Sequence, residues 1–116
     1  MRILLVENHQ TFAEIVATQF LTEHEVVILS KVSEALSRLR ESTFDAILVD
    51  YDLDDGKGSE LVEWLRGSGF GGVVVGVSSH HEGNQALLRA GANSVCPKAE
   101  FQNISSVLKA ALGVHL

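Results

Sequence analysis

Short apolar segments alternate five times with longer amphipathic segments along this chain of 116 residues. The apolar segments predict strands at residues 3–6, 26–29, 46–49 and 73–77, and a weak fifth strand at 94–96. Only the third and fourth look apolar enough to be buried on both faces. The alternation is typical of an α/β protein in which helices cover both faces of a parallel sheet.

Apolar residues between these strands recur at spacings of three and four, which predicts five helices, each with one buried face. The first two faces consist of Phe12, Ile15, Val16 and Phe20, and of Val32, Ala35, Leu36 and Leu39. The other three consist of Leu61, Val62 and Leu65, of Ala86, Leu87 and Ala90, and of Ile104, Val107, Leu108 and Ala111. We expect Trp64, on the third helix, to be partly buried.

Two helix ends carry recognisable signals. Thr11 and Glu14 have the spacing of a capping box for the first helix. Gly91 directly follows the fourth helix and suits a left-handed cap.

Composition narrows the class of protein further. We expect one domain over residues 1–116, because this length can bury a core without disulfides or metals. The single cysteine, Cys96, excludes an internal disulfide and a cysteine-based zinc site. The net charge of -6, with nine Lys and Arg residues that form no cluster, argues against direct nucleic-acid binding. No signal peptide or membrane span is recognisable, so we expect a cytoplasmic location.

Polar residues follow four of the predicted strands. They are Glu7-Asn8, Asp50-Tyr51-Asp52, Ser78-Ser79 and Lys98. Ligands of open parallel sheets bind beyond the carboxyl ends of the strands, where these residues are expected to meet. Carboxylates for Mg²⁺, a hydroxyl and an ammonium together suit phosphoryl chemistry.

Each of these residues also has a purely structural interpretation. Asp50 alone is typical of a turn, and Glu7 and Asn8 could cap the first helix. The acidic residues Asp52, Asp54 and Asp55 resemble a solvated loop. The functional interpretation rests on the four strand ends together.

The spacing of these residues resembles that of response-regulator receiver domains, a flavodoxin-like family that includes the chemotaxis regulator. An apolar strand ends in Glu7-Asn8, and a second ends in Asp50, with Gly58 eight residues later. Ser78 matches the family's switch hydroxyl, and Lys98 follows Gly91 by seven residues, as in the last family motif. The resemblance implies a three-layer (βα)5 sandwich whose five-stranded parallel sheet has the order 2-1-3-4-5.

The resemblance also implies the role of each site residue. A histidine kinase or histidine phosphotransfer protein would donate a phosphoryl group to Asp50, and the domain would assist its own phosphorylation and dephosphorylation without being an enzyme. Mg²⁺ would be held by the pair Glu7 and Asn8, by Asp50 and by the backbone carbonyl of Asp52. Lys98 would contact the phosphoryl group. Ser78 would turn towards it and so change the contacts with a downstream protein target.

Several positions depart from the family pattern. Asn8 stands where the family has a second aspartate, which predicts weaker metal binding. Val95 replaces the switch aromatic residue, so no large side-chain switch is expected there. Pro97 precedes Lys98, whereas many relatives have proline after the lysine, and Asp54 replaces a common proline.

These departures keep a second function open, that of a receiver-like interaction module that works with little or no phosphorylation. A third possibility, a hydrolase or phosphatase with Asp50 as nucleophile, is disfavoured because the chain is too short for a substrate pocket. Residues 67–72 (GSGFGG) fit a dinucleotide-binding pattern but follow a helix, so we interpret them as a turn. We expect His9, His80 and His81 to be solvated rather than to form a metal site. The oligomeric state is left open.

Overall fold

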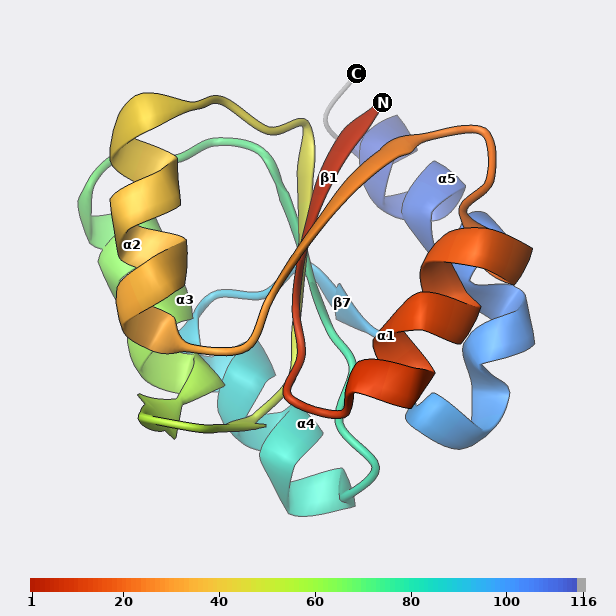
Figure 1. Ribbon diagram of the computed structural model, residues 1–116. Coiled ribbons are helices and arrows are strands. Elements are labelled where there is room, and N and C mark those ends of the chain that lie inside the picture. The colour runs from red at the N-terminus through yellow and green to blue at the C-terminus, as the bar shows by residue number, and fades with distance from the viewer. Residues whose placement is uncertain (115–116) are drawn as a thin grey trace.

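Five parallel strands form one sheet in the computed structural model, which describes residues 1–114 (Figure 1). The strands are β1 (Arg2–Val6), β2 (Glu25–Leu29), β3 (Ala46–Val49), β6 (Val73–Gly76) and β7 (Ser94–Val95). Their order is β2-β1-β3-β6-β7, which confirms the predicted order and the flavodoxin-like sheet.

Helices cover both faces of this sheet (Figure 1). One face carries α1 (Gln10–Ile15), the π-helical turn η1 (Val16–Phe20), the 3₁₀ segment η2 (Lys98–Asn103) and α5 (Ile104–Val114). The other face carries α2 (Val32–Glu41), α3 (Gly58–Gly67) and α4 (His81–Ala90). An apolar cluster fills the space between the sheet and each helical layer, so the three predicted layers are present.

The first strand corrects one prediction. Ile3, Leu4, Leu5 and Val6 are all fully buried, so β1 is as deeply buried as β3 and β6. The reason is the strand order, which gives β1 a hydrogen-bonded neighbour on each side and apolar layers above and below. Its sequence is no less apolar than that of the other two strands, and the expectation that only two strands are buried was wrong.

The first helix corrects two further predictions. It begins at Gln10, His9 precedes it, and no side chain caps it, so the capping box of Thr11 and Glu14 is not formed. Ile15 is 40 % exposed rather than part of the core face. The core contacts come from Ala13 and Val16, and the π-helical turn then adds a residue, because Leu21 N–H donates to Val16 O across five residues.

The predicted cap of α4 is confirmed. Gly91 has φ +125°, in the region that favours glycine. Its N–H donates to Leu88 O at 3.1 Å, and Ala92 N–H donates to Leu87 O at 3.0 Å. These two bonds form a Schellman motif, which ends the helix and turns the chain towards β7.

The predicted core faces of α3 and α5 are also confirmed. Leu61, Val62, Leu65, Ile104, Leu108 and Ala111 are buried. Trp64 is 37 % exposed, which fits the expected partial burial. No helix within the described residues has the length and apolar character needed to cross a membrane.

Candidate functional site

The carboxyl ends of β1 and β3 lie side by side because these strands pair in parallel with Val6 opposite Val49. The next residues along the two strands are Glu7 and Asp50. Asp50 N–H continues the ladder by donating to Val6 O at 2.9 Å. Glu7 is 1 % exposed and Asp50 is 5 % exposed, so the sheet register places two carboxylates next to each other and away from water.

One ammonium group neutralises part of this charge. Lys98 Nζ lies 2.9 Å from Glu7 Oε1, 3.0 Å from Glu7 Oε2 and 3.1 Å from Asp50 Oδ2. It also lies 4.9 Å from the centre of the Phe12 ring, which covers it. Lys98 is separated from Asp50 by 48 residues and from Glu7 by 91, and the structure brings all three predicted site residues together.

Asp50 is held by the backbone around it. Its Oδ1 accepts a hydrogen bond from Tyr51 N–H at 2.8 Å. Gly58 N–H donates to Tyr51 O at 2.6 Å. A Cβ atom at position 58 would stand only 1.9 Å from Asp50 O, so only glycine allows this close approach.

Ser78 lies at the end of β6, and only 2 % of it is exposed. Its Oγ accepts a hydrogen bond from His80 N–H at 3.1 Å, within its own loop. Its backbone carbonyl accepts a hydrogen bond from Lys98 N–H at 3.4 Å. The hydroxyl is therefore bound to its own loop in this conformation.

Asn84 on α4 holds the Ser78 backbone and was missed by the sequence analysis. Its Oδ1 accepts from Ser78 N–H at 3.0 Å, and its Nδ2 donates to Ser78 O at 3.0 Å. A Cβ atom at the preceding Gly83 would lie 2.7 Å from Ser78 Oγ and 3.0 Å from Tyr51 Cβ. The start of α4 therefore packs directly on the loops that follow β3 and β6. A polar residue on the buried face of a predicted helix was the only sequence signal for Asn84.

His9 is a second residue that the sequence analysis missed. Its backbone N–H donates to Glu7 Oε2 at 3.0 Å, and its Nδ1 lies 3.2 Å from Lys98 Nζ. Burial raises the pKa of Glu7 above its usual 4.5, and the hydrogen bonds from His9 N–H and Lys98 oppose that rise. The expectation of solvated histidines is confirmed for His9, His80 and His81, which are all exposed. The His9 side chain is 71 % exposed, with its Nδ1 at the rim of the site beside Glu7.

Potential metal ligands converge in this pocket around the Lys98 ammonium. Ligand atoms of Glu7, His9 and Asp50 all lie within 4.8 Å of one another. Asn8 Oδ1 is buried and has no hydrogen-bond partner among the described residues. A buried carbonyl oxygen without a donor, next to Glu7 in the chain, is an oxygen ligand of the kind that a hard or borderline cation accepts.

Asp52 and Asp54 lie at the edge of this pocket. The Asp52 side chain is 57 % exposed and pairs with Lys57 Nζ, whereas the buried carboxylates pair with Lys98. This pair joins the short strands β4 (Asp52–Leu53) and β5 (Gly56–Lys57), a hairpin that we did not predict. Asp54 lines a cleft of about 410 Å³ that also contains Glu7 and Asn8.

Two departures from the family pattern are visible in the structure. Val95 is half-buried on β7. The peptide bond before Pro97 is trans, like every other one in residues 1–114.

Residues 67–72 form a turn between α3 and β6, as we interpreted them. Gly69 has φ +88°. The Arg66 guanidinium donates to Phe70 O and Gly72 O at 2.9 Å each. The carbonyls of this turn therefore bind a side chain of the protein itself.

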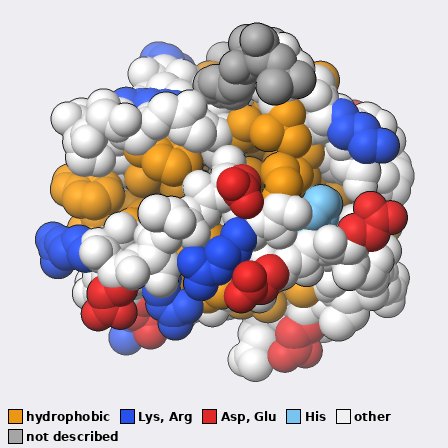
Figure 2. Space-filling model, turned by 90° about the horizontal axis from the view of Figure 1, so that it is seen from above, with side chains coloured by type: hydrophobic (Ala, Val, Ile, Leu, Met, Phe, Trp, Pro, Cys, Tyr) orange, Lys and Arg blue, Asp and Glu red, His pale blue; other side chains and the backbone are white. Residues whose placement is uncertain are grey.

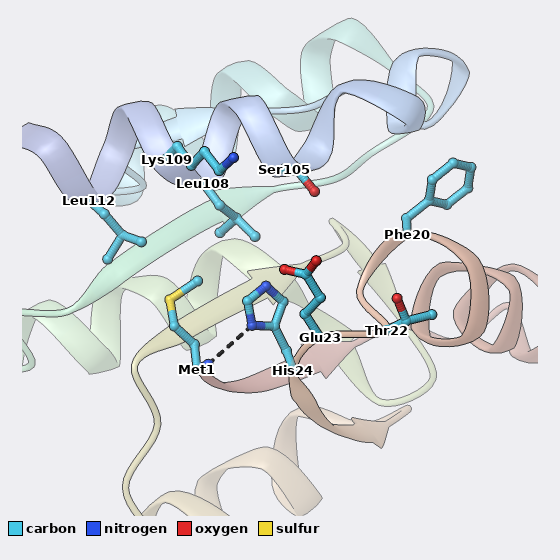
Figure 3. Close-up of a pocket in the computed structure, with 9 residues that line it drawn as sticks. All are labelled: Met1, Phe20, Thr22, Glu23, His24, Ser105, Leu108, Lys109 and Leu112. Atoms are coloured by element: carbon cyan, nitrogen blue, oxygen red, sulfur yellow. Dashed lines mark hydrogen bonds between the residues drawn. The ribbon is translucent and has the colours of Figure 1, made fainter.

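Other cavities lie at the opposite edge of the sheet, where the strands begin. Figure 2 shows apolar side chains exposed in separate patches on this face. A cavity of about 370 Å³ there contains His24, whose Nδ1 lies 3.1 Å from the Met1 amine (Figure 3). Glu23 and Lys109 at its rim are exposed, and Leu108 and Leu112 complete an apolar wall. No set of converging buried charges like that at the carboxyl edge is found here among the described residues.

Comparisons with known proteins agree with this geometry. A family model described as the response regulator receiver domain matches residues 3–109. A response regulator receiver protein of Anaeromyxobacter sp. (strain Fw109-5) is 34 % identical over 101 residues, which is 84 % of this chain. The chain spans only 42 % of the length of that relative.

Solved structures with the same fold include two well-covered examples. The CheY-like receiver domain protein of Methanospirillum hungatei JF-1 is 25 % identical with a TM-score of 0.85, over 97 % of this chain and 93 % of that one. The response regulator TrrA of Thermotoga maritima is 18 % identical with a TM-score of 0.85, over 95 % of this chain and 97 % of that one.

Proposed function

Since the chain belongs to the response regulator receiver domain family, we propose that it accepts a phosphoryl group on Asp50 from a histidine kinase or a histidine phosphotransfer protein. Members of this family serve as signalling switches in two-component phosphorelays. The observation that carries the proposal is the sharing of Lys98 Nζ between the buried carboxylates of Glu7 and Asp50. We further propose that this exchange takes place in the cytoplasm.

The chemistry of the transfer follows from the surroundings of Asp50. A carboxylate oxygen of Asp50 attacks phosphorus, the P–N bond of the donor phosphohistidine breaks, and its electron pair returns to the imidazole nitrogen. Lys98 Nζ, 3.1 Å from Asp50 Oδ2, compensates the charge that collects on the phosphoryl oxygens. Tyr51 N–H binds Oδ1 of the attacking carboxylate, and Gly58 allows the chain to pack on the Asp50 backbone carbonyl.

The side chains of Glu7, Asn8 and Asp50, together with the backbone carbonyl of Asp52, would hold Mg²⁺. When bound, the ion would supply positive charge that compensates the phosphoryl oxygens. Asn8 Oδ1 is free to contribute because it has no other partner within the described chain. The Thermotoga maritima relative was solved in complex with Mg²⁺-BeF, which supports a metal-assisted site in this fold.

Ser78 is the proposed switch. Its Oγ now accepts from His80 N–H, and phosphorylation of Asp50 offers it a charged acceptor. Asn84 on α4 forms two hydrogen bonds with the Ser78 backbone, so a movement of this loop also moves α4. The phosphoryl group thus shifts the population of α4 arrangements and changes contacts with a downstream protein, without direct nucleic-acid binding.

Mass spectrometry of the intact protein tests the proposal. The chain is incubated with acetyl phosphate and Mg²⁺, and the expected result is a gain of one phosphoryl group. Asp50→Asn should gain none, whereas Asp45→Asn, a change of an exposed aspartate that precedes β3 at the opposite edge of the sheet, should be modified like the unaltered chain. An unmodified mass under saturating donor would reject the proposal.

The alternative, an interaction module that works with little or no phosphorylation, is favoured by Asn8, which brings no charge to the metal pocket. The variant Asn8→Asp separates the two functions. It should increase phosphorylation at limiting Mg²⁺, because the added carboxylate interacts with the cation by about 4 kcal/mol before desolvation. If neither the unaltered chain nor this variant is modified, the interaction module remains.

A further inference from the structure

We propose that this pocket binds a transition-metal divalent cation of the Co²⁺ and Zn²⁺ class through Glu7, His9 and Asp50, with His9 supplying a nitrogen ligand. The inference deepens the proposed function, because it uses the same metal pocket. It does not depend on phosphorylation, since binding of the metal alone can be measured.

The Lys98 ammonium shows that these side chains can surround one cation. Its Nζ lies 2.9 Å from Glu7 Oε1, 3.1 Å from Asp50 Oδ2 and 3.2 Å from His9 Nδ1. Two carboxylate oxygens and an imidazole nitrogen are therefore directed at one positive centre. A bound divalent ion would take over these interactions from the ammonium.

One tautomer of His9 suits a metal ligand. An ammonium group has no lone pair and can only donate, so the tautomer that forms a hydrogen bond with Lys98 Nζ, 3.2 Å away, is the one in which His9 Nδ1 accepts. The ring proton then lies on Nε2. The 3.3 Å approach of His9 Nδ1 to Glu7 Oε2 is then no hydrogen bond, and Glu7 Oε2 is instead satisfied by His9 N–H at 3.0 Å. His9 Nδ1 thus presents a lone pair towards the carboxylates.

The composition of the ligand set determines which ion it prefers. Mg²⁺ prefers oxygen ligands in near-ideal octahedral geometry, whereas imidazole suits Zn²⁺, Ni²⁺ and other transition ions. Asn8 provides a neutral oxygen where a carboxylate would strengthen Mg²⁺ binding, and its Oδ1 is buried without a partner in residues 1–114. Loss of charge at position 8 combined with nitrogen at position 9 shifts the preference away from Mg²⁺.

Lys98 competes with the ion for the same two carboxylates. Its side chain is only 14 % exposed, and it must leave Glu7 and Asp50 before a cation can occupy the space between them. Substitution Lys98→Met removes this internal cation. Metal binding should therefore become tighter in Lys98→Met than in the unaltered chain.

Equilibrium titration of the tag-free chain with Co²⁺ in phosphate-free buffer tests the inference, with calorimetry for affinity and visible absorption for ligand type. His9→Ala should weaken Co²⁺ binding at least about tenfold and alter the absorption spectrum, and should leave Mg²⁺ affinity unchanged. His81→Ala is the matched control, because His81 is exposed at the start of α4 and is not among the three ligands. It should bind Co²⁺ like the unaltered chain.

Unchanged Co²⁺ affinity and spectrum in His9→Ala would overturn the inference, as would an equal loss in His81→Ala. An equal loss of Co²⁺ and Mg²⁺ affinity in His9→Ala would also overturn it, because His9 would then act on the structure of the pocket rather than on the choice of ion. If Asp50 is phosphorylated with Mg²⁺ but Co²⁺ binding does not depend on His9, only this inference is rejected. If Co²⁺ binding depends on His9 but the chain accepts no phosphoryl group, only the proposed function is rejected.

Discussion

Individual buried polar groups decide how this site is held together. Glu7 and Asp50 are nearly inaccessible, and such carboxylates are tolerated only when they are paired or hydrogen-bonded. Lys98 pairs with both, and the N–H groups of His9 and Tyr51 each bind one of them. Removing one partner of such a group leaves a buried charge without compensation, so these residues are energetically coupled.

Asn84→Ala tests the anchor of the Ser78 loop. The change removes two buried hydrogen bonds to the Ser78 backbone and should lower the free energy of unfolding by about 1–3 kcal/mol. Urea denaturation measures this difference. Gln85→Ala changes the half-buried neighbour on α4 and should lower the free energy of unfolding by less than about 0.5 kcal/mol. Equal costs for the two variants would contradict the assigned role of Asn84.

Among the secondary-structure elements, the β4–β5 hairpin connects the acceptor loop to α2. The N-terminus of α2 has no side-chain cap of its own, because Lys31 precedes it. Asp55 supplies the cap from the hairpin and accepts from Val32 N–H at 2.6 Å, Ser33 N–H at 3.1 Å and Ser33 Oγ at 2.7 Å. The loop that follows Asp50 is therefore anchored at both ends, at Gly58 and at α2.

Asp55→Ala should lower the thermal midpoint at neutral pH because α2 loses its cap. The hydrogen bond from the Ser33 hydroxyl is the main cause that lowers the pKa of Asp55 below its usual 3.8. Asp55 with a lowered pKa stabilises the fold fully above pH 3.8, and this contribution is lost as the pH falls through the folded pKa.

The difference in thermal midpoint between the unaltered chain and Asp55→Ala should therefore shrink in acid. Asp54→Asn, at the exposed neighbouring position, serves as the control and should show no such pH dependence. A difference for Asp55→Ala that stayed constant down to strongly acidic pH would show that the carboxylate charge of Asp55 is not involved.

At the scale of the whole molecule, one sheet separates two apolar clusters and places the charged pocket at one edge. β1, β3 and β6 are buried on both faces, so the strands that end in Glu7, Asp50 and Ser78 are the most rigidly packed. The apolar patches of Figure 2 lie at the opposite edge. The pocket can therefore change its charge while the packed core that positions it stays fixed.

Leu48→Ala tests how the core holds the site. Leu48 is fully buried in the same cluster as Cys96, and its truncation should cost about 2–5 kcal/mol. Burial also raises the pKa of the Cys96 thiol above its usual 9.0, so this thiol should react with a labelling reagent only when the fold opens. Leu48→Ala should speed the labelling. Ile28→Ala, at a 37 % exposed position on the edge strand β2, should change the labelling rate little. Faster labelling in Ile28→Ala than in Leu48→Ala would contradict the role of Leu48 in the core.

Local sequence patterns were sufficient to predict the strands of the five-stranded sheet, the buried faces of α3 and α5, and the residues that follow each strand. The reason is that strand and helix periodicities are local, and parallel pairing brings all carboxyl ends to one edge. Glu7, Asp50 and Lys98 could therefore be expected in one pocket without coordinates, although their roles remain predictions.

Contacts between side chains of separate elements became apparent only in the folded chain. Three such contacts join separate elements of the fold. They are the contact of His9 with Lys98, the hydrogen bonds of Asn84 with Ser78, and the cap of α2 by Asp55. Ile15 turned out to be exposed because the side of the helix that meets the sheet consists of Ala13 and Val16. Such contacts depend on side-chain direction and on the distance between packed elements, and neither quantity is encoded in local periodicity.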